Sequence, residues 1–310
     1  GEARDLDARG RRTDAPGGSA GLDQHRGAQT LGGELGRGLA HARVAGLGER
    51  DALLKKQKQH PFFLYYALQQ PHVPRTPSPR FVGTSGMGPR GDVIVEADWC
   101  VGELLKTLKE EGILENTLIV FSSDNGPVLS DGYYDDAVEK LGAHKPAGAS
   151  RGGKYSLFEA GTRVPFITYW KGNIKAGKSD ALVSQVDLFT SLANFVGSNL
   201  TVPDSQNMMD VFLGKSDSGR VDLILEATSR TAYRNDDWVL IPPYNGPAIS
   251  KEVNIELGNS KTFQLYNIKQ DMGQKNNLAK ENPEKLKEML TAFEAIRGNN
   301  YKSIQNLELK

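Results

Sequence analysis

Three short apolar runs of buried-strand length constrain the fold of this chain most strongly. They occupy residues 62–68, 117–121 and 164–170. Between the first two, apolar residues recur at helical spacing over residues 94–108, and Gly112 follows as a stop signal. Strand, helix and strand in this order predict an α/β fold with a mainly parallel sheet flanked by helices.

Acidic residues mark the expected starts of two helices. Asp92 is placed to cap the helix over residues 94–108. Ser184 and Asp187 have the spacing of a capping box and predict a second helix, which Gly197 ends.

Beyond residue 198 the pattern changes to polar connections and alternating apolar runs, at residues 221–227, 231–241 and 262–267. A last amphipathic helix is predicted to start at Pro283 and to end at Gly298. We therefore expect an α/β domain over residues 53–198, followed over residues 199–310 by a linker and a small antiparallel sheet packed by one helix.

Residues 1–52 differ in composition from the rest of the chain, because they contain no Phe, Tyr, Trp, Ile, Met, Asn or Lys. Such a segment buries too little apolar surface to offset chain entropy, which predicts a disordered low-complexity tail. The abrupt change in composition equally fits non-native sequence, such as an out-of-frame translation. Both interpretations stay open, and this segment contributes nothing to the predicted fold.

Charge and cysteine content limit the classes of partner. The 310 residues carry no formal net charge, so no basic surface for nucleic acid is indicated. The single cysteine, Cys100, excludes an intrachain disulfide. No apolar run approaches the roughly 20 residues of a membrane span, and no signal-peptide pattern opens the sequence. We expect a soluble protein.

Polar clusters follow two of the predicted strands. His72 and Arg75 come after the first, and Asp124, Asn125 and Gly126 come after the second. Ligands of open α/β sheets bind beyond the carboxyl ends of strands, so both clusters are expected to face one crevice. The adjacent oxygens of Asp124 and Asn125 suit calcium or magnesium. The same three residues also fit an ordinary tight turn.

A glycine-rich loop then presents Lys154. Residues 148–154 match the G-x-x-x-x-G-K part of a phosphate-binding P-loop, but Tyr155 stands where Ser or Thr would hold magnesium. Neither a strand before the loop nor a long helix after it is predicted. These departures disfavour nucleotide binding.

Four segments, residues 61–75, 91–105, 122–127 and 151–165, resemble successive blocks of the type I sulfatases of the alkaline-phosphatase-like superfamily. Residues 264–279 resemble the C-terminal subdomain of that family. The resemblance spans roughly residues 59–297, with its motifs in the family's order.

The resemblance implies roles for three pairs of residues. Asp124 and Asn125 match two ligands of the family's calcium ion, for which magnesium is an alternative. His72 and Lys154 match residues that contact the sulfate group, although His72 could instead cap a turn. His144 and Lys145 precede the lysine loop and are expected to touch the substrate, a small-molecule or glycan sulfate ester.

Other family features are missing. The sequence has neither an Asp-Asp pair after a first strand nor the Cys/Ser-x-Pro-x-Arg motif that yields the formylglycine nucleophile. Cys100 cannot substitute, because Pro and Arg do not follow it and it lies on the apolar side of a helix. The intact form is expected to hydrolyse sulfate esters with calcium and formylglycine, and this chain to be inactive.

Two alternatives remain. The protein could be a phosphatase or phosphodiesterase of the same superfamily, or a binding protein for sulfated glycans without catalysis. Relatives are commonly exported, so the resemblance implies a periplasmic, lysosomal or extracellular location.

Overall fold

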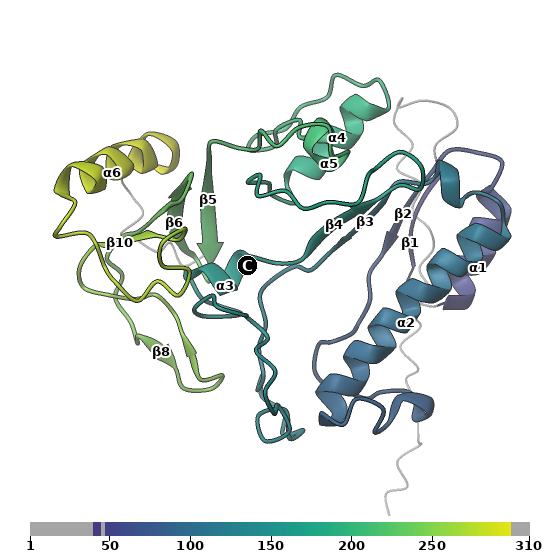
Figure 1. The fold of residues 1–310 in the computed structure, drawn as a ribbon, viewed down its shortest axis with the longest axis horizontal. Helices are drawn as coiled ribbons and strands as arrows, with labels where there is room; N and C mark the ends of the chain where they lie inside the picture. The colour runs from purple at the N-terminus through teal and green to yellow at the C-terminus, as the bar shows by residue number, and fades with distance from the viewer. Residues whose placement is uncertain (1–39, 45–46, 299–310) are drawn as a thin grey trace, which may run out of the picture.

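A computed structural model describes residues 40–44 and 47–298 of the chain (Figure 1). The first elements are β1 (Ala40–Val44), α1 (Leu47–Gln57) and β2 (Phe62–Tyr66), and β1 pairs with β2 in parallel. The expectations for residues 1–39 lie outside the described residues. The domain boundary predicted at residue 52 falls inside α1, so the folded part of the chain begins before it.

Arg50 explains how α1 joins the fold despite its polar composition. Its side chain is only 1% exposed, and its guanidinium donates to the carbonyl oxygen of Cys100 and to the Asp51 carboxylate, at 3.2 and 2.8 Å. The same group lies over the ring of Tyr66, 5.6 Å from its centre. One buried arginine therefore links α1 to β2 and to the helix that carries Cys100.

That helix, α2 (Gly88–Glu110), starts four residues before the predicted cap. Asp92 is thus not its N-cap. A glycine and a proline open the helix, and proline suits the first turn because its missing N–H would have no partner there. Asp92 lies buried inside α2, and its carboxylate accepts hydrogen bonds from the backbone N–H groups of Gly83 and Ser85, at 2.8 and 3.0 Å. It fixes the loop before α2.

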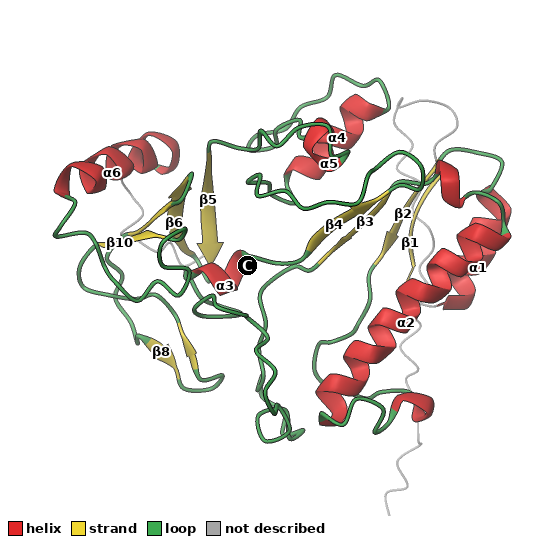
Figure 2. Ribbon diagram, viewed as in Figure 1, coloured by secondary structure: helices red, strands yellow, loops and turns green. Residues whose placement is uncertain are grey.

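The second pair of strands, β3 (Ile119–Ser122) and β4 (Phe166–Tyr169), is antiparallel, with Phe121 opposite Ile167. The order of the elements predicted a mainly parallel sheet, so this pair is an antiparallel part of it. The connection over residues 123–165 contains only a four-residue helix, α3 (Glu159–Thr162), in place of a crossover helix. The chain therefore returns alongside β3 in the opposite direction (Figure 2).

Helices α4 (Asp187–Phe195) and α5 (Met209–Phe212) lie against one face of β3 and β4. Met209 and Phe212 form a buried cluster there, against which Leu118 and Phe166 pack. One half of the predicted capping box is present, because Asp187 accepts a 2.9 Å hydrogen bond from the Ser184 backbone N–H. Helix α4 itself begins at Asp187, with Val186 as its N-cap and no side-chain cap hydrogen bond.

The C-terminal subdomain agrees with its prediction. Its antiparallel sheet has the order β10-β7-β6-β5. The strands are β5 (Asp222–Ala227), β6 (Arg230–Asn235), β7 (Trp238–Ile241) and β10 (Gln264–Asn267), with a small hairpin of β8 (Ile249–Ser250) and β9 (Ile255–Glu256). Helix α6 (Pro283–Arg297) packs on it through buried Met289 and Phe293.

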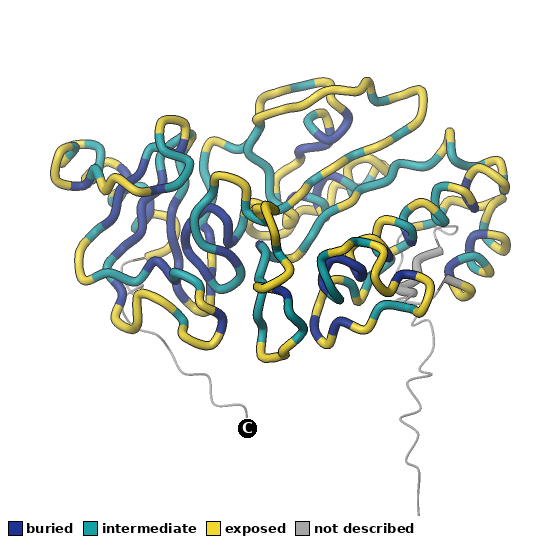
Figure 3. The backbone as a smooth tube through the Cα atoms, turned by 60° about the horizontal axis from the view of Figure 1, so that its bottom comes forward, coloured by how far each residue is buried: buried dark blue, intermediate teal, exposed yellow. Residues whose placement is uncertain are grey.

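Burial is uneven along the chain. Figure 3 shows nearly continuous buried tube in the C-terminal sheet, whereas β2, β3 and β4 are only partly covered. Short 3-10 turns (Pro79–Phe81 and Leu114–Asn116) complete the described elements. Within the described residues, no helix combines the length and the apolar character needed to cross a bilayer.

Candidate active site

The loop after β2 fixes the orientation of His72. A carbonyl oxygen can only accept a hydrogen bond, so the 2.7 Å contact with the Val73 oxygen requires Nδ1 of His72 to carry the hydrogen. Nε2 then points away from its own turn, and it lies 3.3 Å from Nζ of Lys154. The imidazole therefore directs Nε2, the nitrogen without a hydrogen in this tautomer, toward the lysine loop.

Arg75 connects the same turn to the long connection after β3. It forms a buried ion pair of 2.8 Å with Asp135, and its guanidinium also donates to the carbonyl oxygens of Val128 and Leu129, at 3.2 and 2.8 Å. A further bond of 3.1 Å reaches the Pro71 oxygen. Arg75 thus holds the loop over residues 128–135 beside His72.

Asp124 and Asn125 form a turn directly after β3. Such a turn is compatible both with a metal site and with an ordinary tight turn, the two interpretations of the sequence. Oδ1 of Asp124 accepts from the Asn125 backbone N–H at 3.0 Å, and the Asn125 amide donates to the Gly126 oxygen at 2.9 Å. Among the described residues, neither Oδ2 of Asp124 nor Oδ1 of Asn125 has a hydrogen-bond partner. Each side chain therefore keeps one oxygen for a ligand.

Backbone hydrogen bonds fix this turn beside the lysine loop. The Gly126 N–H donates to the Gly161 oxygen at 2.9 Å, and the Lys154 N–H donates to the Pro127 oxygen at 3.0 Å. Any Cβ at Gly126 would collide with the carbonyl oxygen of Ala160 in α3. The structure therefore brings together His72, Lys154 and the Asp124–Asn125 turn.

Asp131 is a site residue that sequence reasoning missed. Its carboxylate accepts from Nζ of Lys154 at 2.8 Å and from the Tyr155 hydroxyl at 3.1 Å. Burial by itself would raise the pKa of Asp131, but these two hydrogen bonds and the charges of Lys154 and His72 hold it below its ordinary value. Asp131 lies in an irregular loop with no motif, so only the spatial arrangement identifies it.

The same contact favours the charged form of Lys154. Burial lowers the pKa of its ammonium group, but hydrogen bonding to Asp131 and Tyr155 outweighs burial, and the net pKa lies above the ordinary value. Lys154 is therefore cationic throughout the neutral pH range.

The C-terminal subdomain supports the lysine loop from behind. Buried Glu159 binds Arg163 at 2.7 Å and Arg234 of β6 at 3.1 Å, and Arg151 binds Glu256 of β9 at 2.8 Å. The Arg151 hydrogen bond lowers the pKa of the Glu256 carboxyl. Glu159 and Arg163 thus help to hold the lysine loop in place.

His144 and Lys145 lie apart from these contacts. Both are exposed on the connection between β3 and α3, and within the described residues no hydrogen bond or ion pair joins their side chains to His72 or Lys154. Their role in substrate contact stays a prediction.

The donor set fits part of a metal site. Side-chain oxygens of Asp124 and Asn125 are ligands that calcium accepts, but calcium takes six to eight oxygens. The described residues contain no cluster of three or more His, Cys, Asp or Glu that could hold a metal ion. Asp124 and Asn125 can therefore supply two ligands, and the others must come from elsewhere.

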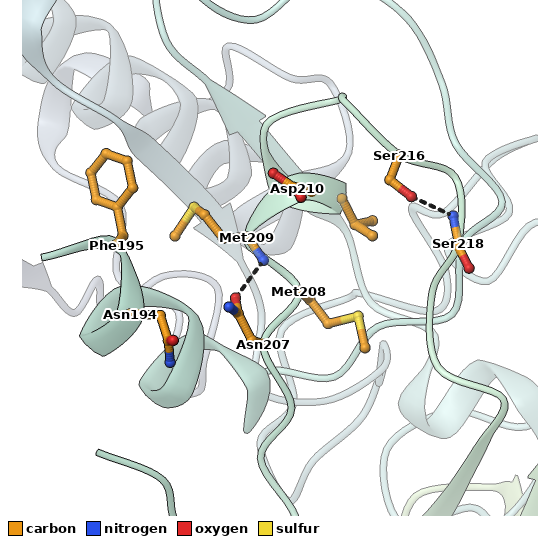
Figure 4. Close-up of a pocket in the computed structure, with 9 residues that line it drawn as sticks. Asn194, Phe195, Asn207, Met208, Met209, Asp210, Ser216 and Ser218 are labelled. Carbon is orange, nitrogen blue, oxygen red and sulfur yellow. Dashed lines mark hydrogen bonds between the residues drawn. The ribbon is translucent and has the colours of Figure 1, made fainter. Parts of the chain in front are cut away.

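A separate open pocket of about 450 Å³ lies between the end of α4 and the segment that carries α5 (Figure 4). Its ionisable lining residue is Asp210, and the others are polar or apolar: Asn194, Phe195, Asn207, Met208, Met209, Val211, Ser216 and Ser218. With no lysine, arginine or histidine in its lining, it has no cation for an anionic ester. The site at Lys154 is the better candidate on chemical grounds.

Comparison with known proteins identifies the family. A family model described as Sulfatase matches residues 48–198. This chain belongs to the sulfatase family. An N-acetylgalactosamine-6-O-sulfatase of Bacteroides thetaiotaomicron is 44% identical over 250 residues, which make up 79% of this chain and 49% of the relative. Human arylsulfatase A is 34% identical over 177 residues, or 56% of this chain and 33% of the relative.

Solved structures confirm the alkaline-phosphatase-like fold class. A sulfatase structure from work on glycosaminoglycan metabolism by Bacteroides thetaiotaomicron superposes with a TM-score of 0.78 at 43% identity, and covers 80% of this chain and 53% of that chain. Homologues of the sulfatase domain are sulfuric ester hydrolases by name. The chain spans about half the length, or less, of the curated relatives that it matches.

Proposed function

We propose that this chain provides the sulfate-binding part of a sulfatase active site, and that the complete protein hydrolyses sulfate esters of carbohydrates. One observation carries the proposal: Nζ of Lys154 and Nε2 of His72 lie 3.3 Å apart, beside the Asp124–Asn125 turn. A cation and a ring nitrogen that is open to protonation at this spacing can contact one sulfate group together.

Lys154 is suited to bind the negative charge of the ester. A sulfate ester carries one negative charge, which moves onto the leaving oxygen as the S–O bond breaks, and fixed cations stabilise that charge. The ammonium has three N–H donors. One bonds Asp131 and a second can bond Nε2 of His72, so one remains for a sulfate oxygen, and a second is released when Nε2 is protonated. Asp131 orients the ammonium without occupying all of its donors.

His72 is suited to donate a proton to the leaving group. Its Nδ1–H is engaged by the Val73 oxygen, so Nε2 is the nitrogen that gains and loses a proton. When protonated, Nε2 can donate to the departing alkoxide oxygen, which is the role of a general acid.

Asp124 and Asn125 would supply two oxygen ligands to calcium, or to magnesium as an alternative. The metal, when bound, supplies positive charge that stabilises the sulfate oxygens. Because the sequence has no formylglycine precursor motif, we propose that this chain by itself binds sulfate esters without turnover. A dedicated glycan-binding protein would also bind sulfate esters without turnover. The two proposals differ only in whether the complete protein hydrolyses the ester.

The first substrate to test is a sulfated amino sugar, since a relative at 44% identity is named N-acetylgalactosamine-6-O-sulfatase. Calorimetric titration of the 310-residue chain with 6-O-sulfated N-acetylgalactosamine tests the proposal. We expect binding that weakens at least tenfold in Lys154→Ala and persists in Lys269→Ala, which alters an exposed lysine of the C-terminal subdomain.

The matching phosphate ester separates the alternative chemistry. Preference for the sulfated sugar supports a sulfatase, whereas tighter binding of the 6-phosphate would favour a phosphatase or phosphodiesterase. Equal binding by the wild type and Lys154→Ala would refute the assignment of this site.

A further inference from the structure

One face of the β3–β4 pair is open. Phe121 lies opposite Ile167 in the register, so the two side chains share a face, and Tyr169 lies two residues along on that face. These three large side chains are 39%, 56% and 41% exposed. The other face of the pair carries Phe166, which packs in the cluster with α4 and α5.

The β1–β2 pair has the same asymmetry. Tyr66 faces Arg50 of α1, whereas Phe63 and Tyr65, on the opposite side of β2, are 45% and 57% exposed. In Figure 1 α1 and α2 lie on the lower right side of β1 and β2, and α4 and α5 lie above β3 and β4. Each pair of strands thus has one covered face and one face that exposes aromatic or branched side chains.

Each pair also has an edge to which no other described strand is hydrogen-bonded. Among the described strands, β2 pairs only with β1, and β3 pairs only with β4. An isolated two-stranded sheet is marginally stable in water, and an unpaired edge is a template for another strand. The open strands β2 and β3 are those that lead to His72 and Asp124, so the incomplete part of the sheet adjoins the incomplete metal site.

We propose that these edges and faces are the docking surface for the complementary half of a sulfatase domain, which adds at least one strand to the edge of β3 and covers Phe121, Ile167 and Tyr169. The comparisons indicate this occupant. The matched segment covers 49% of the relative named N-acetylgalactosamine-6-O-sulfatase, so half of that relative has no counterpart here.

Chemistry favours the same occupant over a second copy of this chain. A second copy would bring another Asp124 and Lys154, but no nucleophile and no further pair of metal ligands. The complementary half would bury the apolar faces and supply the missing groups at the same edge. Exposed large apolar surface of this kind marks a protein interaction site.

Co-expression tests the proposal. The 310-residue chain is produced with a tagged polypeptide that comprises the unmatched half of the Bacteroides thetaiotaomicron relative, and the mass of the purified material is measured by light scattering. We expect a one-to-one complex. Hydrogen exchange should slow at β3 amides in the complex, because a new strand pairs with them.

Two isoleucines provide a matched pair of variants. Ile167 on β4 and Ile296 on α6 are 56% and 51% exposed, so aspartate at either position disturbs the free chain to a similar degree. Ile167→Asp should reduce recovery of the complex at least tenfold, and Ile296→Asp should leave it unchanged. Lys154→Ala should also assemble normally, which separates docking from the proposed sulfate contact.

Three results would overturn the inference. They are failure of the two polypeptides to copurify, equal recovery with Ile167→Asp and Ile296→Asp, and a dimer of this chain alone that Ile167→Asp dissociates. The last result would assign the face to a second copy.

Discussion

The backbone N–H of Lys154 donates a 3.0 Å hydrogen bond to the carbonyl oxygen of Pro127. This bond joins the lysine loop to the turn after β3, although the two segments are separated by a long irregular connection. The position of Lys154 therefore depends on the turn that carries Asp124 and Asn125, and a disturbance of that turn should reach the lysine.

Gly126→Ala should disturb both segments. The added Cβ would collide with the Ala160 oxygen, and overpacking of this kind costs about 1–3 kcal/mol or more. Thermal unfolding followed by circular dichroism should show a lower midpoint. Gly102→Ala is the control, because open space surrounds that α2 glycine and alanine should stabilise the helix by about 0.5–1 kcal/mol. Equal effects of the two changes would refute the steric argument.

Arg75→Ala should destabilise the protein strongly. Removal of one partner from a buried ion pair leaves the other charge unpaired, at a cost of roughly 3–5 kcal/mol. Lys171→Ala breaks an exposed pair with Glu115, which solvent screens, and should change the stability little. Urea unfolding measures both. If Arg75→Met combined with Asp135→Leu were as unstable as Arg75→Ala, the unpaired carboxylate would not be the cause.

The Asp131 contact should respond to acid. The pKa of Asp131 is lowered in the folded protein, so its contribution to stability is complete above the ordinary aspartate pKa, and is lost as the pH falls through the lower folded value. Urea unfolding of wild type and Asp131→Asn should therefore differ at pH 7 and converge toward pH 2. A difference that stays constant over this range would exclude ionisation of Asp131 as its origin.

Calcium should bind this chain weakly. Two side-chain oxygens, from Asp124 and Asn125, are far fewer than the six to eight that calcium takes. Calorimetry should give a dissociation constant in the millimolar range or weaker, and Asp124→Ala should remove the remaining heat. Micromolar affinity that survives Asp124→Ala would show that the ion binds at another place.

Local patterns were enough to predict much of the fold. The alternating apolar runs predicted the C-terminal sheet, and Pro283 predicted the start of α6. Both signals lie within a few neighbouring residues, so the sequence alone was enough. The antiparallel direction of β4 was not predicted, because it depends on a connection without periodicity. Asp92 was misplaced as a cap for a similar reason: its carboxylate serves the loop before α2, and only tertiary contacts reveal that.

The site was predictable where motifs occur. His72, Lys154, Asp124 and Asn125 lie in such segments, and the structure brings these segments together. Asp131 and the organising role of Arg75 depend on contacts across more than twenty residues of irregular chain. No periodicity or spacing records such contacts, so the sequence could not indicate them.

The most direct test of the account follows the histidine side chains by long-range proton–nitrogen NMR during titration with 6-O-sulfated N-acetylgalactosamine. We predict that free His72 carries its hydrogen on Nδ1, that the ester shifts its Nε2 resonance, and that Lys154→Ala abolishes the shift while Lys269→Ala preserves it. An Nε2 resonance that does not move, or that moves equally in Lys154→Ala, would contradict the assignment of His72 and Lys154 to one sulfate-binding site.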